Sequence, residues 1–88
     1  NQGNSYAQDY LGEMYKEGQG VTQDYKEAFK WFEKSANQGN IFSQKKLGEM
    51  YNQGQGIEVD KEKAKQLYKK SCDKGLEESC KKLKEYNF

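Results

Sequence analysis

Histidine, arginine and proline are all absent from this 88-residue chain. Without histidine, the chain lacks the commonest general base and most means of activating a nucleophile. Without arginine, it lacks the bidentate donor that phosphate and guanine recognition favour, so we expect no nucleic-acid partner. No apolar run approaches the roughly 20 residues of a membrane span. Because two cysteines without histidine leave half of a zinc shell empty, we expect no metal and no cofactor.

Residues typical of a hydrophobic core are also scarce. Leu, Ile, Val and Phe together number 13, about 15% of the chain, which is in the range where disorder becomes plausible. The net charge is only +1, and disorder by composition needs a large net charge. Aromatic residues can supply the missing core, since each buries about 150 to 250 Å². We therefore expect one small domain over residues 1–88, too short for a catalytic cleft between domains.

A repeat with an offset of 36 residues organises the chain. Two motifs recur at this offset, Asn-Gln-Gly-Asn at 1–4 and 37–40 and Leu-Gly-Glu-Met-Tyr at 11–15 and 47–51. The repeat predicts two full units, 1–36 and 37–72, and a partial third unit, 73–88. Because the chain opens in the middle of a repeating pattern, we expect it to be a fragment of a longer protein.

Each unit is expected to consist of two helices that stop at glycines. In the first unit, Leu11 and Tyr15 fall on one face at helical spacing, and Gly18 follows where a left-handed C-cap is usual. The second helix is expected to begin after Asp24, an N-cap that forms a capping box with Glu27. The expected apolar face of this helix consists of Ala28, Trp31, Phe32 and Ser35. The second unit repeats the arrangement with Asp60 as cap and Ala64, Leu67, Tyr68 and Ser71 as face.

Two glycines, Gly12 and Gly48, stand inside the expected first helices. A glycine in a helix interior costs about 1 kcal/mol relative to alanine, and close approach of the partner helix would offset that cost. In the third unit Lys84 occupies the aligned position, where no second helix follows. We therefore predict that residues 77–87 form a terminal capping helix with a more polar outer face.

These motifs resemble the Sel1-like repeat, a relative of the tetratricopeptide repeat. Its pattern is small-x-x-x-Leu-Gly-x-x-Tyr, then Gly-x-Gly-Val, then Asp-x-x-x-Ala-x-x-aromatic-aromatic. Residues Ala7 to Phe32 match it, and Ser43 to Tyr68 match it again with Leu67 in place of the first aromatic. The resemblance implies an all-α fold, a right-handed α/α solenoid of two repeats plus a C-terminal capping helix. It also implies a non-enzymatic module that binds a protein or peptide.

The two cysteines, Cys72 and Cys80, stand eight residues apart. One continuous helix would separate their Cα atoms by about 12 Å, too far for a disulfide, but Gly75 ends the helix between them. The Cys-x7-Cys placement is similar to that of the Helicobacter cysteine-rich proteins, which are secreted Sel1-type proteins. We therefore expect a disulfide and, with it, a secreted or periplasmic bacterial protein. The alternative is a pair of buried free thiols.

The first helix of each unit lines the concave surface in two-helix solenoids. Registering the chain on the related tetratricopeptide motif assigns the groove positions to Tyr6, Asp9, Glu13, Lys16, Phe42, Lys45, Glu49 and Asn52, with Glu78, Lys81, Glu85 and Phe88 from the cap. Of these, Tyr6 and Phe42 are aromatic residues outside the core pattern, and we expect them to anchor an apolar side chain of a partner. The alternative is that both rings only cover helix starts.

The sequence is also compatible with three other hypotheses about function. The pattern Ser-x-x-Lys is compatible with a β-lactam-binding or hydrolysing protein, and it occurs at Ser43/Lys46, Ser71/Lys74 and Ser79/Lys82. Its partner motifs are absent, and nearly one such match is expected by chance. The chain could also be a structural spacer from a longer array, or associate weakly with a second copy through the N-terminal repeat face.

Overall fold

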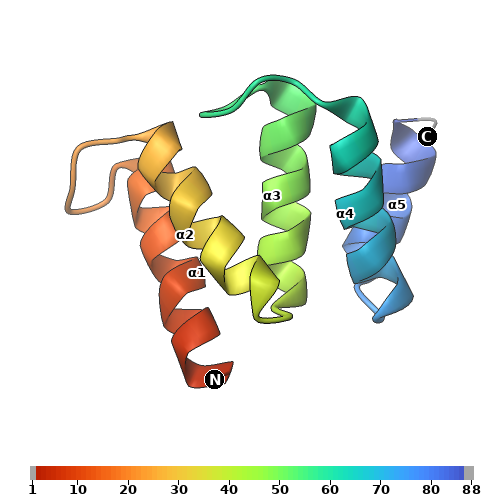
Figure 1. Ribbon diagram of the computed structural model, residues 1–88, viewed down its shortest axis with the longest axis horizontal. Coiled ribbons are helices and arrows are strands. Elements are labelled where there is room, and N and C mark those ends of the chain that lie inside the picture. Colours follow the sequence, from red (N-terminus) through yellow and green to blue (C-terminus); the bar gives the residue numbers. More distant parts are fainter. Residues whose placement is uncertain (1, 87–88) are drawn as a thin grey trace.

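The computed structural model describes residues 2–86, which form five α-helices and no strand (Figure 1). The helices are α1 (Gln2–Glu17), α2 (Tyr25–Asn37), α3 (Ile41–Gln53), α4 (Lys61–Asp73) and α5 (Glu77–Glu85). Each helix packs against its neighbour in the sequence, and α3 stands between α2 and α4. The predicted all-α solenoid of two helix pairs and a capping helix is thereby confirmed. The predicted groove residue Phe88 lies outside the described residues.

The second helix of each unit begins at an aspartate, as predicted. The Asp24 carboxylate accepts hydrogen bonds from the backbone N–H groups of Lys26 and Glu27 at 3.0 and 3.2 Å. The predicted capping box is wrong in its second half, because the Asp24 N–H donates to the carbonyl of Tyr15 at 2.9 Å. The Glu27 side chain pairs instead with Lys30 at 3.3 Å. This backbone hydrogen bond to Tyr15 ties the end of the loop to the first helix of the same unit.

Both helix-interior glycines lie against an aromatic ring of the partner helix, which confirms the predicted close approach. A Cβ atom at Gly12 would lie 2.6 Å from Phe32 Cε1, well inside van der Waals contact. At Gly48 the corresponding distance to Tyr68 Cε1 is 3.2 Å. Phe32 and Tyr68 are both fully buried, so neither ring has free space into which it can retreat.

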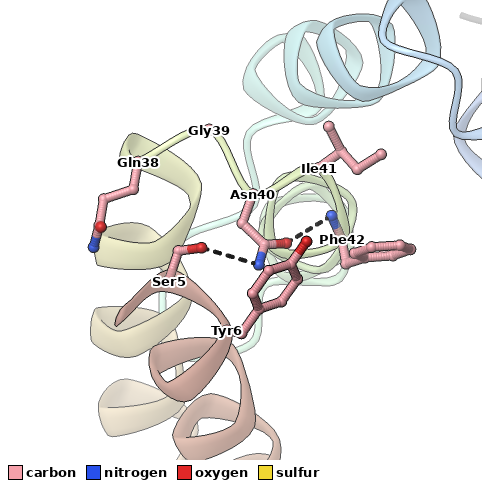
Figure 2. Close-up of a pocket in the computed structure, with 7 residues that line it drawn as sticks. All are labelled: Ser5, Tyr6, Gln38, Gly39, Asn40, Ile41 and Phe42. Atoms are coloured by element: carbon pink, nitrogen blue, oxygen red, sulfur yellow. Dashed lines mark hydrogen bonds between the residues drawn. The ribbon is translucent and has the colours of Figure 1, made fainter. Parts of the chain in front are cut away.

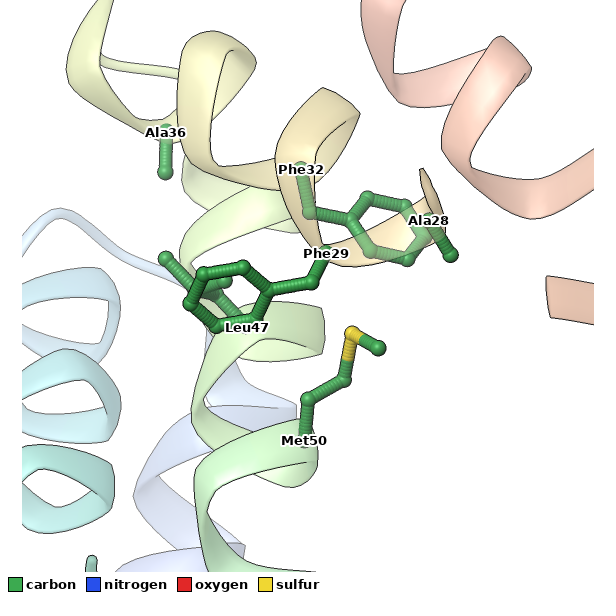
Figure 3. Packing of buried hydrophobic residues seen from close by; sticks show 6 residues of the cluster. All are labelled: Ala28, Phe29, Phe32, Ala36, Leu47 and Met50. Atoms are coloured by element: carbon green, nitrogen blue, oxygen red, sulfur yellow. The ribbon is translucent and has the colours of Figure 1, made fainter. Parts of the chain in front are cut away.

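The hydrophobic core lies between α2 and α3 (Figure 3). Its buried members are Ala28, Phe29, Phe32, Ala36, Leu47 and Met50. Phe29 was not predicted to belong to it, and its ring packs edge-on against Tyr51 with the ring centres 5.4 Å apart. Trp31, which the sequence predicts on the apolar face, is only half buried. The buried face of α2 therefore turns further toward α3 than the sequence pattern suggests.

Paired serines mark each junction between a second helix and the next first helix. Ser43 Oγ lies 2.7 Å from Ser35 Oγ at the α2–α3 junction, and Ser71 Oγ lies 2.6 Å from Ser79 Oγ at the α4–α5 junction. All four residues are fully buried. Because a buried hydroxyl without a partner costs about 1 to 3 kcal/mol, these pairs fix the register of one unit on the next.

The predicted disulfide between Cys72 and Cys80 is present, with the two Cα atoms 4.9 Å apart. It joins the last turn of α4 to the first turn of α5, beside the second serine pair. The aligned residues at the first junction are Ala36 and Gln44, where the Gln44 amide donates to the Ala36 carbonyl at 3.3 Å. The same position is therefore covalent in one junction and hydrogen-bonded in the other.

Replacing the two buried glycines should affect stability unequally. Gly12→Ala should lower the free energy of unfolding by about 1 kcal/mol, because overpacking a core costs about 1 to 3 kcal/mol and alanine recovers about 1 kcal/mol of helix propensity. Gly48→Ala, with more space, should stay within about 0.5 kcal/mol of wild type. Urea unfolding followed by circular dichroism measures both. Equal stability of the two variants would contradict the packing that we describe.

Removing the disulfide should destabilise the domain. The crosslink closes a loop of nine residues, counted from Cys72 through Cys80, for which the chain-entropy relation gives about 2 to 3 kcal/mol. The double variant Cys72→Ser/Cys80→Ser should unfold at a correspondingly lower urea concentration. As a control, a reductant should lower the midpoint of the wild type but leave that of the double variant unchanged. Identical midpoints for oxidised and reduced wild type would be inconsistent with this contribution.

Candidate functional site

Ion pairs tie the first helices α1, α3 and α5 to one another. Lys46 Nζ on α3 lies 2.8 Å from Asp9 Oδ2 and 3.4 Å from Glu13 Oε1 on α1. The next pair of helices is bridged by Lys45 and Glu78 at 3.0 Å and by Lys82 and Glu49 at 3.7 Å. The ion pairs therefore bring five of the predicted groove positions, Asp9, Glu13, Lys45, Glu49 and Glu78, together on the face shared by α1, α3 and α5. We call this face the concave surface, after the prediction.

Much of the charge on the concave surface is neutralised within the chain. Asp9 accepts a hydrogen bond from the buried Ser43 hydroxyl at 2.6 Å in addition to its ion pair with Lys46. Its side chain and that of Lys46 are both less than one fifth exposed. A partner would have to break this pair to use either charge, so Asp9 and Lys46 position α1 on α3.

The remaining predicted positions differ in how accessible they are. Asn52 is 9% exposed, and both its side-chain oxygen and its backbone carbonyl accept hydrogen bonds from Lys61 Nζ, at 2.8 and 3.0 Å. Lys16 is half buried near the end of α1. Lys81 and Glu85 are exposed and line a hollow between α3 and α5. The hollow also contains Lys45, Glu49, Glu78 and Lys82.

An aromatic pocket of about 210 Å³ opens where α1 meets the start of α3 (Figure 2). Its lining consists of Ser5, Tyr6, Gln38, Gly39, Asn40, Ile41 and Phe42. Tyr6 is 59% exposed and Phe42 is 44% exposed, although both are large aromatic residues. The structure therefore places the two predicted anchors in one pocket, one from each repeat.

A hydrogen-bonded asparagine fixes the base of the aromatic pocket. Asn40 Oδ1 accepts from the backbone N–H groups of Phe42 and Ser43 at 2.9 and 3.0 Å, which makes Asn40 the N-cap of α3. Its amide nitrogen lies 3.5 Å from Ser5 Oγ on α1 (Figure 2). Asn40 was not predicted as a cap, although an asparagine directly before an apolar-periodic segment is an N-cap signal. Lys46 and Lys82, which occupy equivalent positions 36 residues apart, were predicted only as members of Ser-x-x-Lys patterns and not as residues of this surface.

The serines of the Ser-x-x-Lys patterns are not accessible. Ser43, Ser71 and Ser79 are all fully buried and hydrogen-bonded within the serine pairs. An acylation reaction needs a nucleophile that its substrate can reach, and this burial argues against all three. Among residues 2–86 no cluster of Cys, Asp and Glu is suited to hold a metal ion. None of the helices described is long and apolar enough to cross a membrane.

Comparison with known proteins shows a consistent family pattern. The sequence model of the Sel1 repeat matches residues 5–40 and 41–76. A Sel1 repeat protein from Oxalobacter formigenes has a similar structure, with a TM-score of 0.90 and 37% identity over 92% of this chain and 61% of that one. A protective antigen of uropathogenic Escherichia coli with an SLR fold gives a TM-score of 0.88 and 39% identity, over 90% of this chain and 17% of that one.

Cysteine rich protein B of Helicobacter pylori is also similar. Its TM-score is 0.82 over 86% of this chain and 57% of that one, and at 24% identity the likeness shows the fold alone. The chain thus spans less than two thirds of the length of each of these three proteins. A search of curated protein sequences returns no significant match.

The ion pair between Lys45 and Glu78 should be visible in a titration. The hydrogen bond from Lys45, followed by its charge, lowers the pKa of the Glu78 carboxyl below its ordinary value. Because the folded-state pKa is lowered, the stability that this contact contributes is present above the unfolded pKa and lost as pH falls through the folded pKa. Lys45→Met should raise the pKa of Glu78 toward its ordinary value, as measured by carboxyl-detected NMR.

Lys81 provides the matched control, because it also lowers the pKa of Glu78 but by a smaller charge effect. Lys81→Met should therefore raise that pKa by less than Lys45→Met does. If the two variants shift the Glu78 titration equally, the direct contact with Lys45 is not its main cause.

Proposed function

Because the chain belongs to the Sel1-repeat family, whose fold typically mediates protein–protein interaction, we propose that it is a non-enzymatic module that binds a protein or peptide segment on its concave surface. One observation carries the proposal. Tyr6 and Phe42 come from different repeats, remain largely exposed and line one pocket with a rigid base. Exposed aromatic rings in a preformed pocket are typical anchors for a partner's apolar side chain.

The surroundings of the aromatic pocket favour a peptide with both apolar and polar character. The concave surface next to it presents charges of both signs, with Lys81 and Glu85 exposed at its far end on α5. The paired charges between the helices hold the surface in shape before a partner arrives, which reduces the entropy cost of binding. We therefore assign anchoring to Tyr6 and Phe42, and selectivity to the exposed charges.

We also propose that the protein works in an oxidising compartment, either secreted or periplasmic. The disulfide between Cys72 and Cys80 supports this location, since disulfides are rare in reducing cytosol. The similar structures come from bacteria, which supports a bacterial protein of the cell envelope or the medium.

The anchor assignment can be tested with peptides selected on the immobilised protein from a phage-displayed random library. Peptides bound by the wild type should lose about thirtyfold in affinity with Tyr6→Ala or Phe42→Ala, the loss of about 2 kcal/mol typical of a binding hot spot. Tyr10→Ala is the matched control, because Tyr10 is 65% exposed on the same helix but does not line the pocket. Unchanged affinity in both anchor variants would refute the assignment.

A further inference from the structure

A second groove, formed by α2, α3 and α4, shares no residue with the concave surface or the aromatic pocket. It has a volume of about 210 Å³. Because α3 stands between α2 and α4 (Figure 1), we call α3 the floor of the groove and α2 and α4 its walls. Each helix contributes residues about one turn apart, among them Glu33 from α2, Leu47 and Tyr51 from α3, and Lys63, Leu67 and Lys70 from α4. We call this the outer groove.

Three hydrophobic residues line the outer groove, Leu47 and Tyr51 from the floor and Leu67 from the α4 wall. Leu47 is buried, while Tyr51 and Leu67 are half buried and pack against the core. Phe29 holds the Tyr51 ring from below by edge-on contact. The Tyr51 hydroxyl is a hydrogen-bond donor at neutral pH, as for any tyrosine, and burial, followed by the nearby charges of Glu33 and Asp60, raises its pKa further. The floor can therefore accept an apolar side chain and donate one hydrogen bond.

The wall formed by α4 carries two exposed lysines, Lys63 and Lys70. Lys63 and Lys70 are exposed on either side of Leu67, and neither forms an ion pair within the described part of the chain. On the opposite wall Glu33 provides a single negative charge. The lysines stand seven residues apart, about 10.5 Å along the helix, which is the spacing of two helical turns.

The equivalent positions of the first repeat can be compared with Lys63, Leu67 and Lys70 of α4. Thirty-six residues earlier, the equivalents of Lys63, Leu67 and Lys70 are Glu27, Trp31 and Lys34 on α2. On α2 both charged side chains interact with other residues of the chain. Glu27 forms an ion pair with Lys30 at 3.3 Å, and the Lys34 Nζ atom lies 4.6 Å from the centre of the Trp31 ring. The three positions on α4 differ, because among residues 2–86 neither Lys63 nor Lys70 forms an ion pair and Leu67 between them is only half buried.

We propose that the outer groove binds an acidic amphipathic helix of a partner protein. One apolar side chain of that helix packs on Tyr51 and Leu67, and two carboxylates seven residues apart pair with Lys63 and Lys70. Helices commonly bind in grooves through apolar residues on one face, with charges at the rim setting specificity. Glu33 on the far wall repels further carboxylates and so fixes which side of the helix faces α4. This second site is independent of the proposed peptide anchor on the concave surface.

Two synthetic helical peptides of about 15 residues, near the lower limit for stable isolated helices, provide the probe. Both carry a central leucine, and they differ only in having two glutamates or two lysines at positions seven residues apart that flank it. Titrated into the ¹⁵N-labelled protein with its disulfide intact, the acidic peptide should shift the amide resonances of Tyr51 and Leu67. The basic peptide should bind about tenfold more weakly or not at all.

Charge reversal on α4 separates a specific site from general attraction. Lys63→Glu/Lys70→Glu should reverse the preference between the peptides, while the matched Lys65→Glu/Lys69→Glu, with the same net charge on the same helix but outside the groove, should retain it. All four side chains are exposed, and circular dichroism verifies that the variants fold. Equal effects of the two variants, or no binding of the acidic peptide, would overturn the proposal.

Discussion

Each repeat depends on an aromatic ring that lies directly against a glycine of the neighbouring helix. Phe32 covers Gly12 in the first unit and Tyr68 covers Gly48 in the second, with too little room for a Cβ atom at Gly12 and barely enough at Gly48. This contact sets the distance between the two helices of a unit. The distance between the helices in turn decides how their other side chains divide between the core and the surface. The shape of both grooves therefore depends on the contact between ring and glycine.

Stacking of the units relies on polar contacts to an unusual extent. The buried serine pairs, the bond from Gln44 to the Ala36 carbonyl and the ion pairs of Lys46 join successive units. Polar contacts of this kind are directional, and they contribute little net energy compared with the cost of leaving them unmade. In a chain with so few aliphatic residues, they specify how the units stack, while Phe29, Phe32 and Tyr68 are the large aromatic residues buried in the core.

The sequence was sufficient to predict features that repeat or that depend on local chemistry. The offset of 36 residues, the caps at Asp24 and Asp60 and the pairing of Cys72 with Cys80 belong to this class. It was insufficient where the outcome depends on the rotation of a helix. Phe29 and Trp31 differ by two positions, and only the packing of α2 on α3 decides that Phe29 is buried.

Contacts between units also escaped prediction. Lys46 reaches Asp9 and Glu13 because α1 and α3 lie side by side, and no spacing within one unit contains that information. Identical residues at equivalent positions of the two repeats can also differ in burial. Leu11 and Leu47 are equivalent, yet Leu47 is buried beneath α2 and Leu11 remains half exposed. Tyr6 and Phe42, which we propose as anchors, could be singled out from the sequence because they lie outside the core pattern, whereas the outer groove requires three helices to be placed together.

The two junctions between units differ in a way that matters if the chain is stretched. At the α4–α5 junction the disulfide transmits tension directly from Cys72 to Cys80, so the residues between them are shielded and cannot extend. At the α2–α3 junction the resistance to the pull is entirely non-covalent, and it comes from the buried core between the two helices, the ion pairs of Lys46, the hydrogen bond of Gln44 and the serine pair. A force applied at the two ends would therefore separate the repeats first between α2 and α3, which opens the aromatic pocket while the last hairpin keeps its length.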